Sequence, residues 1–600
     1  MLSLTTLSAL LLALQATASP VLSERSVEKR HSNCFSYNQA GCQFGTTGRQ
    51  GAVATEVGTC SEIGIDILQQ GGNAADAMIA SALCVGVIGA YHSGLGGGGF
   101  MIVRFNNKNG TGHSYETIDF RETMPAAGNL TLFSSFGVNQ TASTVGGLSV
   151  GVPGELRAWQ TLWQRHGSLP WKSLFQPAIN VARGGFPVNV DLASFLANRT
   201  FILNDANWRE SYAPNGTIIG LGDMCYRRKL ATTLEYIANN GADSFYSGTN
   251  ISRNIVNKVR QTGGIMTEAD LAGYKAIVKE PTMISYRNKK IFSTRAPSSG
   301  AITLSALKIF EGFDGKNFNG TAQPGTPGYN ETEQRLVEAN KFAYGQRATF
   351  GDPAFTANVT YLENSYLTDE VAAAARAKIV SGKTFPVGYY NPSNYFPSRE
   401  AGTSHLATAD GTGMAVSLTT TVNLIWGSQV MTDDGIILND EMDDFSSPGQ
   451  VNAFGFAASP INFIQGGKRP QSSICSSIVE NQNGEFVMAT GSAGGSRIIT
   501  TTLQQLHHYI DQGMNASMST RFPRWHDQLS GTTFFELPNQ AYGLAGYDNS
   551  TVAYFRNIGY NITYQNPLGG STSHAISRLP NGLLEAASDP RKSAGYGAAY

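Results

Sequence analysis

The chain has 600 residues, which is enough for several ordinary domains or for one large α/β domain. Lys and Arg number 43 and Asp and Glu 44, so the basic excess that is typical of a nucleic-acid-binding protein is absent. Charged residues make up only 14% of the chain, against about 25% in typical domains, so solubility must rest on uncharged polar groups or on glycans.

The N-terminus has the pattern of a signal peptide. Leu7 to Leu14 form a short apolar run, and Ala16-Thr17-Ala18 supplies a small-x-small cleavage sequence. The run is too short for a bilayer span, which needs about 20 apolar residues. We therefore expect residues 1–18 to be a signal peptide and the protein to have no transmembrane anchor. Lys29-Arg30 is either a dibasic processing site, which would make residues 19–30 a pro-segment, or a solvated charge pair.

Asn-x-Ser/Thr sequons are dense along the chain, as in a secreted glycoprotein. They stand at Asn109, Asn129, Asn139, Asn198, Asn215, Asn250, Asn319, Asn330, Asn358, Asn515, Asn549 and Asn561. We therefore expect the secretory pathway, ending outside the cell, in a cell wall or in a vacuole.

Secretion makes disulfides permissible for the six Cys residues. Cys34 and Cys42 flank a short loop and form one plausible pair, and Cys60 and Cys84 flank a helical stretch and form another. Cys225 and Cys475 are then left over, and we interpret them as buried thiols. No C-x-x-C sequence or His cluster indicates a metal site.

Residues 51–90 predict a strand followed by two helices. GAVATE is strand-like, CSEIGIDILQQ has apolar residues at helical spacing and ends at Gly71-Gly72, and Asn73 can cap the next helix. A Gly-rich run, 93–99, then precedes the strand-like FMIVRF. Such a run can cradle phosphate, but phosphate loops lead from strand to helix and the Walker Lys is absent. A tight chain reversal is therefore the favoured interpretation.

The rest of the chain divides at Thr403. Residues 150–310 predict mainly helix, 312–330 a surface loop and 366–380 helix, and the aromatic- and Pro-rich segment up to residue 402 predicts irregular structure. Short β-rich segments follow: HLATAD, GMAVSLTTTV, GIIL, SSIVE and EFVMATG. IITTTLQQLHHYIDQG then predicts a helix, and TVAYFRNIGY and HAISRL predict strands.

The first candidate site is Gly402-Thr403-Ser404-His405, where irregular chain meets a β segment. Alone, Thr403 would be an ordinary strand residue. It becomes a nucleophile if backbone cleavage frees its own α-amine as a base. An α-amine has a pKa of about 7.7–8.0, close to working pH. Gly402 on the other side of the bond would leave room for the hydroxyl to attack.

The second candidate site is the acidic segment Glu441-Met442-Asp443-Asp444. Clustered carboxylates usually face solvent, and a metal site would lack supporting ligands, so a docking site for a substrate ammonium is the sharper hypothesis. A strand would point Glu441 and Asp443 one way and Asp444 the other, unless a turn intervenes.

The third candidate site combines two segments. Ser472-Ser473 carries hydroxyls that can hold a carboxylate, and the Gly amides of GSAGGSR, 491–497, can converge on an oxyanion. Each segment alone is more simply interpreted as a turn.

In combination these residues resemble the γ-glutamyltranspeptidase (glutathione hydrolase) family, a group of N-terminal-nucleophile hydrolases. The matching segments, in order, are GGNAADA (71–77), GLGGGGF (94–100), IDFRETMP (118–125), TSHL (403–406), NDEMDDFSSPG (439–449), KRPQSSICSSIV (468–479), GSAGGSRIITT (491–501) and SDPRKSAGY (588–596). SPINFIQGGKRP (459–470) and the Cys60–Cys84 spacing resemble the eukaryotic branch. The resemblance runs from about residue 50 to the C-terminus. Gln471 departs from the family's frequent Leu, and Ser476 from its common Pro.

The resemblance implies a four-layer αββα sandwich and a precursor that cleaves itself between Gly402 and Thr403. The products would be a large subunit, 31–402, and a small subunit, 403–600, paired as a heterodimer. The implied roles are nucleophile for Thr403, its orientation for Thr421, and the oxyanion hole for Gly494 and Gly495. Arg121, Ser472 and Ser473 would hold the substrate α-carboxylate, Asn423, Glu441 and Asp444 would hold its α-ammonium, and Phe454 falls in the family's lid loop.

The implied reaction is ping-pong and needs neither cofactor nor metal. Thr403 would take the γ-glutamyl group from glutathione, release cysteinylglycine, and pass the group to water, an amino acid or a dipeptide. One alternative is a related acylase that takes a cephalosporin or glutaryl side chain, which the intact charged set around Arg121 argues against. The other is a catalytically inactive secreted binding protein, which the retention of Thr403, Thr421 and the Gly pair argues against.

Overall fold

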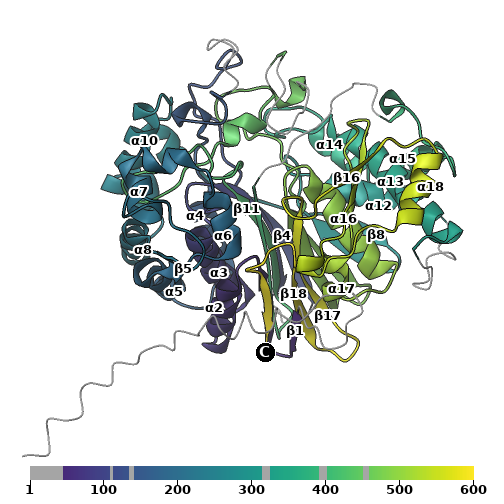
Figure 1. Cartoon of the computed structure of the whole chain (residues 1–600), viewed down its shortest axis with the longest axis horizontal. Helices are drawn as coiled ribbons and strands as arrows, with labels where there is room; N and C mark the ends of the chain where they lie inside the picture. Colours follow the sequence, from purple (N-terminus) through teal and green to yellow (C-terminus); the bar gives the residue numbers. More distant parts are fainter. Residues whose placement is uncertain are drawn as a thin grey trace, which may run out of the picture.

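The computed structural model describes residues 45–107, 112–133, 141–313, 324–390, 402–446, 448–449 and 459–600. Two halves of a β-sheet occupy the centre, and helices cover the outer side of each half (Figure 1). The hydrogen-bonded strand order is β7-β4-β3-β11-β10-β2-β19-β1-β18-β17-β13-β12-β9-β8. The two halves join where β1 pairs with β18 along its length and with β19 at a single position.

The strands alternate between the two parts of the chain on either side of residue 403. The first half-sheet comprises β7 (Ile277–Lys279), β4 (His113–Asp119), β3 (Gly98–Asn106), β11 (Ala415–Thr421), β10 (Ser404–Asp410), β2 (Gly51–Thr55) and β19 (Tyr596–Ala599). The second comprises β1 (Gly45–Gly48), β18 (Leu584–Ser588), β17 (Thr572–Arg578), β13 (Phe486–Ala493), β12 (Ser477–Asn481), β9 (Lys289–Ser293) and β8 (Thr282–Tyr286). Thus β10 and β11 lie between β3 and β2, which come from much earlier in the chain.

Side-chain alternation along these strands builds three apolar layers. In β10, Leu406 faces the helices of the first half, whereas Ala407 and Ala409 face the opposite half-sheet. The layer between the half-sheets is rich in alanine, including Ala52 and Ala54 of β2. Because these side chains are small, two half-sheets can pack closely face to face. A third layer lies under the helices of the second half, so the predicted four-layer αββα sandwich is confirmed.

Helices from the N-terminal part of the chain cover the first half-sheet (Figure 1). They are α2 (Gly58–Gln69), α3 (Ala74–Ile88), α4 (Glu155–His166), α5 (Trp171–Gly184), α6 (Val190–Leu196), α7 (Ala206–Tyr212), α8 (Arg228–Asn240), α9 (Asp243–Tyr246), α10 (Asn250–Gln261) and α11 (Glu268–Gly273). Asn73 caps α3 by accepting hydrogen bonds from the amides of Ala75 and Asp76, as its sequence position predicts. The two-stranded ribbon β5 (Phe186–Pro187) and β6 (Met224–Cys225) lies among these helices.

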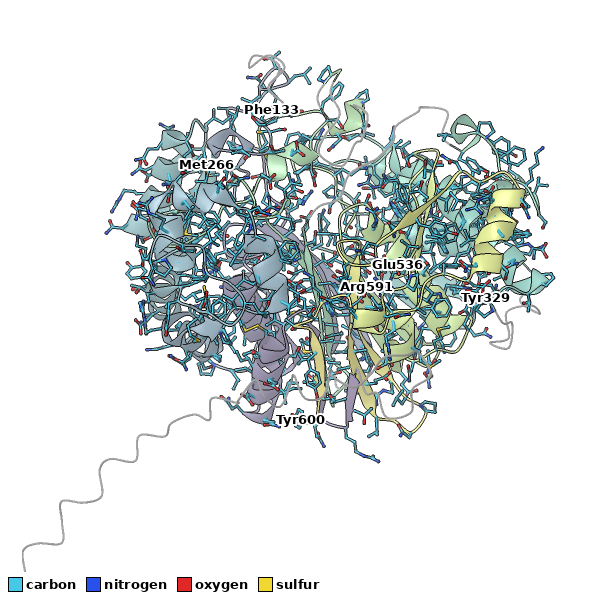
Figure 2. All side chains as sticks on the ribbon, in the orientation of Figure 1. Phe133, Met266, Tyr329, Glu536, Arg591 and Tyr600 are labelled. Atoms are coloured by element: carbon cyan, nitrogen blue, oxygen red, sulfur yellow. A yellow bond between two sulfur atoms is a disulfide. The ribbon has the colours of Figure 1, made fainter. Side chains whose placement is uncertain are left out.

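The second half-sheet is covered by helices from both parts of the chain. They are α12 (Gly300–Glu311), α13 (Pro327–Arg347), α14 (Val359–Ser365), α15 (Asp369–Arg376), α16 (Arg497–Ile510), α17 (Ala516–Arg521) and α18 (Asn549–Asn557). A small sheet of β14 (Trp525–Asp527), β15 (Thr533–Glu536) and β16 (Ile562–Gln565) adjoins them. Arg591, which follows β18, reaches the Glu536 carboxylate of β15, and Figure 2 labels both side chains in this part of the molecule.

Three local predictions differ from the structure. Most of TVAYFRNIGY, up to Asn557, is helical in α18, because Asp548 caps this helix and Val552 and Phe555, three residues apart, are both buried on one face. GIIL forms only isolated bridges, at Ile437 and Leu438. The largely helical region 150–310 also contains β7, β8 and β9, which complete the outer edges of the two half-sheets.

The cysteine predictions are confirmed where the structure describes the residues. Cys60 of α2 is bonded to Cys84 of α3, and Cys225 and Cys475 are buried free thiols. Cys34 and Cys42 lie outside the described residues, as do residues 1–44, with the expected signal peptide and Lys29-Arg30. In the described part of the chain, no helix is both long enough and apolar enough to cross a membrane.

Candidate active site

Gly402 and Thr403 are buried at the entrance to β10, in the middle of the first half-sheet. Thr403 is only 5% exposed. The hydroxyl of Thr421, the last residue of the neighbouring β11, donates a hydrogen bond of 2.8 Å to the carbonyl oxygen of Gly402. Thr421 Oγ in turn accepts from the amide of Asn423 at 2.7 Å. In the uncut chain, Thr421 is therefore positioned to polarise the carbonyl that precedes Thr403.

The space around Gly402 admits no side chain. A Cβ at this position would lie 2.7 Å from Cδ2 of His92 and 2.7 Å from Cδ1 of Ile425. Both distances are far below ordinary van der Waals contact, so glycine is required here by close approach of the His92 ring.

A buried polar cluster holds the residues on both sides of the Gly402–Thr403 bond. Ser404 donates to the carboxylate of Glu56, which also lies 3.2 Å from His92 Nδ1 and 3.0 Å from Lys592 Nζ. Burial opposes ionisation of Glu56, but Lys592 and His92 outweigh it and hold the pKa of this carboxyl well below its usual range. Burial, reinforced by Lys592, lowers the pKa of His92 to about 4, so its ring is neutral at physiological pH.

Arg121 and the acidic segment meet in one buried group. The guanidinium of Arg121 pairs with both Glu441 and Asp444. Residues Glu441–Asp444 form a 3₁₀ turn, η6, in which residues three apart lie on the same face. The turn therefore replaces the strand-like alternation and brings Glu441 and Asp444 together, whereas Asp443 accepts from Ser143 instead.

The two acids retain unused acceptor atoms. Glu441 Oε2 and Asp444 Oδ1 are buried and have no hydrogen-bond partner among the described residues. Burial raises the pKa of Glu441 well above its usual range although Arg121 opposes this, and burial likewise raises the pKa of Asp444. A cation that donates to both oxygens would relieve this unfavourable burial of negative charge.

Asn423 connects this acidic group to the strand that carries Thr421. Its backbone lies in the left-handed region, at φ +73°, and its side-chain amide donates to the carbonyl of Asp440 at 3.1 Å. Asp440 directly precedes Glu441, so Asn423 joins the Thr421–Gly402 contact to the acidic turn.

Ser472 and Ser473 directly follow a segment that Arg121 also holds. Arg121 donates to the backbone carbonyls of Pro470, at 3.3 Å, and Gln471, at 2.9 Å, immediately before the two serines. The structure thus brings Arg121, the two acids and the segment that carries the serine pair together.

Gly494 and Gly495 follow β13 and precede α16, so their backbone amides lie at a helix N-terminus, where N–H groups lack intrahelical partners. Both have positive φ, +119° and +60°, which favours glycine. β13 passes close to the start of β10: a Cβ at Gly491 would lie 2.4 Å from Cε1 of His405. Phe454 lies outside the described residues.

Sequence reasoning missed several buried groups around this site. Glu122 follows Arg121 in the quoted DFRE motif, and burial raises its pKa to about 8 although Arg121 opposes this. Glu56 and Lys592 are distant in sequence, and only their positions in the segments GAVATE and SDPRKSAGY could have pointed to them.

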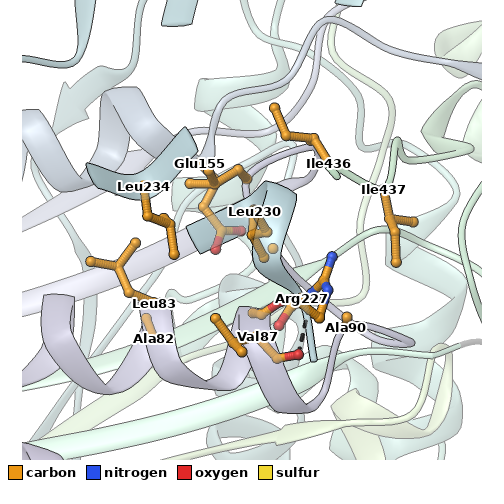
Figure 3. A pocket seen from close by; sticks show the side chains of 14 residues that line it. Ala82, Leu83, Val87, Ala90, Glu155, Arg227, Leu230, Leu234, Ile436 and Ile437 are labelled. Carbon is orange, nitrogen blue, oxygen red and sulfur yellow. Dashed lines mark hydrogen bonds between the residues drawn. The ribbon is translucent and has the colours of Figure 1, made fainter. Parts of the chain in front are cut away.

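Glu155 accepts from the Thr420 hydroxyl and also lines a small, mainly apolar cavity with Ser93 and Arg227 (Figure 3). This cavity lies beneath the Gly-rich reversal.

Known proteins are similar to this chain over most of its length. A family model described as gamma-glutamyltranspeptidase matches residues 60–599. A glutathione hydrolase proenzyme from Arthroderma benhamiae is 43% identical, with 91% of this chain and 92% of the relative covered. A glutathione hydrolase from Aspergillus flavus is 40% identical, with 90% and 88% covered.

Solved structures share the fold. A cephalosporin acylase from Bacillus halodurans has a TM-score of 0.79 at 25% identity and covers 94% of this chain and 98% of its own. A γ-glutamyltranspeptidase from Helicobacter pylori has a TM-score of 0.50 at 27% identity, with 55% of this chain and 92% of its own covered.

Proposed function

The chain belongs to the γ-glutamyltranspeptidase family, and from this premise we propose that it is a glutathione hydrolase and γ-glutamyl transferase whose nucleophile is Thr403. The observation that carries the residue assignment is the continuous buried network from the Gly402 carbonyl, through Thr421 and Asn423, to the acidic turn and Arg121. This network supports the proposal because it links the Gly402–Thr403 peptide bond to the buried group of Arg121, Glu441 and Asp444.

Self-cleavage is the first proposed step. The Thr403 hydroxyl attacks the Gly402 carbonyl, the peptide C–N bond breaks, and the acyl group moves to the Thr403 oxygen while its α-amine becomes free. Water then hydrolyses this ester and releases the Gly402 carboxylate. The Thr421 hydroxyl, 2.8 Å from the Gly402 oxygen, would stabilise the negative charge that develops there. The products are chains 31–402 and 403–600, held as a heterodimer.

Turnover then uses the freed α-amine as the base. It takes the proton of the Thr403 hydroxyl, which attacks the γ-carbonyl of glutathione, and the amides of Gly494 and Gly495 stabilise the oxyanion. Cysteinylglycine leaves with a proton on its amine, and water, an amino acid or a dipeptide resolves the γ-glutamyl ester. No step calls for a cofactor or a metal.

The zwitterionic end of the γ-glutamyl group fits the charges of the site. The α-ammonium would donate to the unused oxygens of Glu441 and Asp444 and lie beside Asn423. The α-carboxylate would bind Arg121 and the hydroxyls of Ser472 and Ser473. A glutaryl group lacks the α-ammonium, so it would leave Glu441 Oε2 and Asp444 Oδ1 without a donor.

The test is the behaviour of Thr403→Ala. We expect the unaltered protein to separate into two chains on a denaturing gel, with a new N-terminus at Thr403 by mass spectrometry, and to release p-nitroaniline from γ-glutamyl-p-nitroanilide. Thr403→Ala should remain a single chain and release none. A purified wild-type protein that stays uncut and inert contradicts the proposal, and faster turnover of a glutaryl anilide than of the γ-glutamyl one would favour the acylase instead.

The N-terminal pattern and the dense sequons support entry into the secretory pathway. We therefore propose a secreted, extracellular protein, with a cell wall or a vacuole as the other destinations.

A further inference from the structure

Arg347, at the C-terminal end of α13, contacts Ser473 of the candidate active site directly and Ser472 through Ser299. Its Nη2 donates to Ser473 Oγ at 3.1 Å. Its Nε donates to Ser299 Oγ at 3.1 Å, and the Ser299 hydroxyl donates to the backbone carbonyl of Ser472 at 2.6 Å. One guanidinium therefore holds one serine directly and the other through a relay. Arg347 is 5% exposed and Ser299 fully buried, so water does not compete strongly for these bonds.

The hydroxyl groups of Ser472 and Ser473 accept hydrogen bonds within the protein, so their own hydrogens are available to donate. A serine hydroxyl has one hydrogen and two acceptor positions. Ser473 Oγ accepts from Arg347, and Ser472 Oγ accepts from the amide of Ile474 at 3.1 Å. Neither hydroxyl hydrogen has an acceptor within the described part of the chain. Both hydrogens are thus available to an anionic oxygen bound next to Arg121.

Gln471 fixes the same segment to the end of α13. Its side-chain amide donates to the carbonyls of Arg347, at 2.9 Å, and Phe350, at 3.0 Å. Arg121 also holds the backbone carbonyls of Pro470 and Gln471. The segment 470–473 is therefore held by the guanidinium groups of Arg121 and Arg347 and by the side-chain amide of Gln471.

The charge of Arg347 suits this place. Burial lowers its pKa to about 10, which still leaves the guanidinium protonated at neutral pH. A positively charged donor polarises the Ser473 hydroxyl and makes its hydrogen a stronger donor to a carboxylate.

We propose that Arg347 is a positioning residue for the α-carboxylate subsite: it orients Ser473 directly and Ser472 through Ser299, so that both hydroxyls donate to the substrate carboxylate. This inference rests on the proposed γ-glutamyl function and adds to it a group that does not itself contact the substrate.

The test compares two anilides that differ only in the α-carboxylate: γ-glutamyl-p-nitroanilide and 4-aminobutyryl-p-nitroanilide. For Arg347→Met, we expect kcat/KM on the γ-glutamyl anilide to fall about 10- to 100-fold, mainly through KM, and to change less than about threefold on the 4-aminobutyryl anilide. Arg347→Lys should recover part of the loss. Ser299→Ala, which interrupts only the relay to Ser472, should show a smaller loss with the same substrate preference. Self-cleavage should remain complete in each.

Arg335→Met is the matched control, since Arg335 lies on the same helix but pairs with Glu331. We expect it to leave kcat/KM unchanged on both anilides. Equal losses on the two anilides would overturn the proposal and assign Arg347 a purely structural role. If Arg347→Met fails to fold, Arg347→Lys and Ser299→Ala decide by the same comparison.

A measurement without turnover separates this proposal from the proposed function. L-Glutamate should raise the Tm of the unaltered, cut protein more than 4-aminobutyrate does, and Arg347→Lys should remove most of that difference. A wild-type protein that is stabilised by glutamate but releases no p-nitroaniline would contradict the proposed activity while leaving the role of Arg347 intact. Undiminished stabilisation in Arg347→Lys and Ser299→Ala would overturn the role of Arg347.

Discussion

At the scale of single residues, the Gly402–Thr403 bond depends on how closely its neighbours approach. His92 is held by Glu56 and Lys592, so its ring cannot easily move away from Gly402. The Ile425 contact, by contrast, involves the far end of a flexible side chain. The His92 ring is therefore the contact that decides which residue can precede Thr403.

Gly402→Ala should slow self-cleavage by about 10- to 100-fold, because displacing the scissile carbonyl by a fraction of an ångström disturbs its alignment with the Thr403 hydroxyl and with Thr421. The measurement is the rate at which freshly produced precursor divides into two chains on a denaturing gel. Gly184→Ala is the matched control, since nothing lies within 4 Å of a Cβ at that position. Cleavage of Gly402→Ala at the wild-type rate would refute the steric argument.

At the scale of secondary-structure elements, the Cys60–Cys84 disulfide joins α2 to α3 across a sequence separation of 24. These helices belong to the layer that covers the first half-sheet, in which β10 begins directly after Thr403. Holding the two helices together therefore supports the strand that follows Thr403, the proposed nucleophile.

Replacing both Cys60 and Cys84 by Ala should lower the free energy of unfolding by about 3 kcal/mol, from the chain entropy that a loop of this length returns to the unfolded state. Chemical denaturation of the uncut Thr403→Ala protein measures this. Cys225→Ala, which removes a buried thiol but no cross-link, should lose less. A double variant as stable as its parent would show that the cross-link contributes nothing.

Local patterns in the sequence predicted many, but not all, of the helices and strands. Short β-rich segments identified β2, β3, β10 and β11, helical spacing of apolar residues identified α2, and a capping Asn identified the start of α3, because these signals are local. α18 was missed because its β-branched and aromatic residues favour a strand locally, whereas Asp548 and burial of one face stabilise the helix. The motif resemblance also indicated the site residues from Arg121 to Gly495.

The rest of the site arises from contacts between distant positions. Arg347 and Ser473 are 126 residues apart, and no spacing in the sequence relates them. The 3₁₀ turn at Glu441–Asp444 likewise depends on how the acidic segment packs beside Arg121. Such contacts become visible only when the fold brings the segments together.

At the scale of the whole molecule, neutral histidines buried between and beside the half-sheets make stability depend on pH. His405 and His574 stack between the half-sheets with ring centroids 6.4 Å apart, and neither ring nitrogen of His574 has a partner in the described residues. Burial lowers the pKa of His574 to about 4. An ordinary His has a pKa of about 6.5. As the pH falls from about 6.5 toward 4, His574 therefore binds a proton in the unfolded chain but stays neutral in the folded chain.

The contribution of His574 is fully present above its unfolded pKa and is lost as the pH falls toward 4. From pH 7 to pH 5, protonation of His574 in the unfolded chain should lower the free energy of unfolding by about 2 kcal/mol. We expect the difference in Tm between pH 7 and pH 5 to be smaller in His574→Asn than in the wild type, whatever the absolute stability of the variant. An unchanged difference in His574→Asn would refute a buried neutral ring.

The strand order has a consequence for the cut protein. If the chain divides before Thr403, β10 and β11 of one product remain between β3 and β2 of the other, and β19 remains between β2 and β1. Neither product owns a continuous half-sheet, so each would expose unpaired strand edges alone. The uncut chain finds this arrangement within one molecule, whereas two separated products would have to meet and interleave strand by strand. Cleavage would therefore remove the peptide link that keeps these interleaved strands in one chain during folding. The cut protein, once unfolded, would not regain its structure.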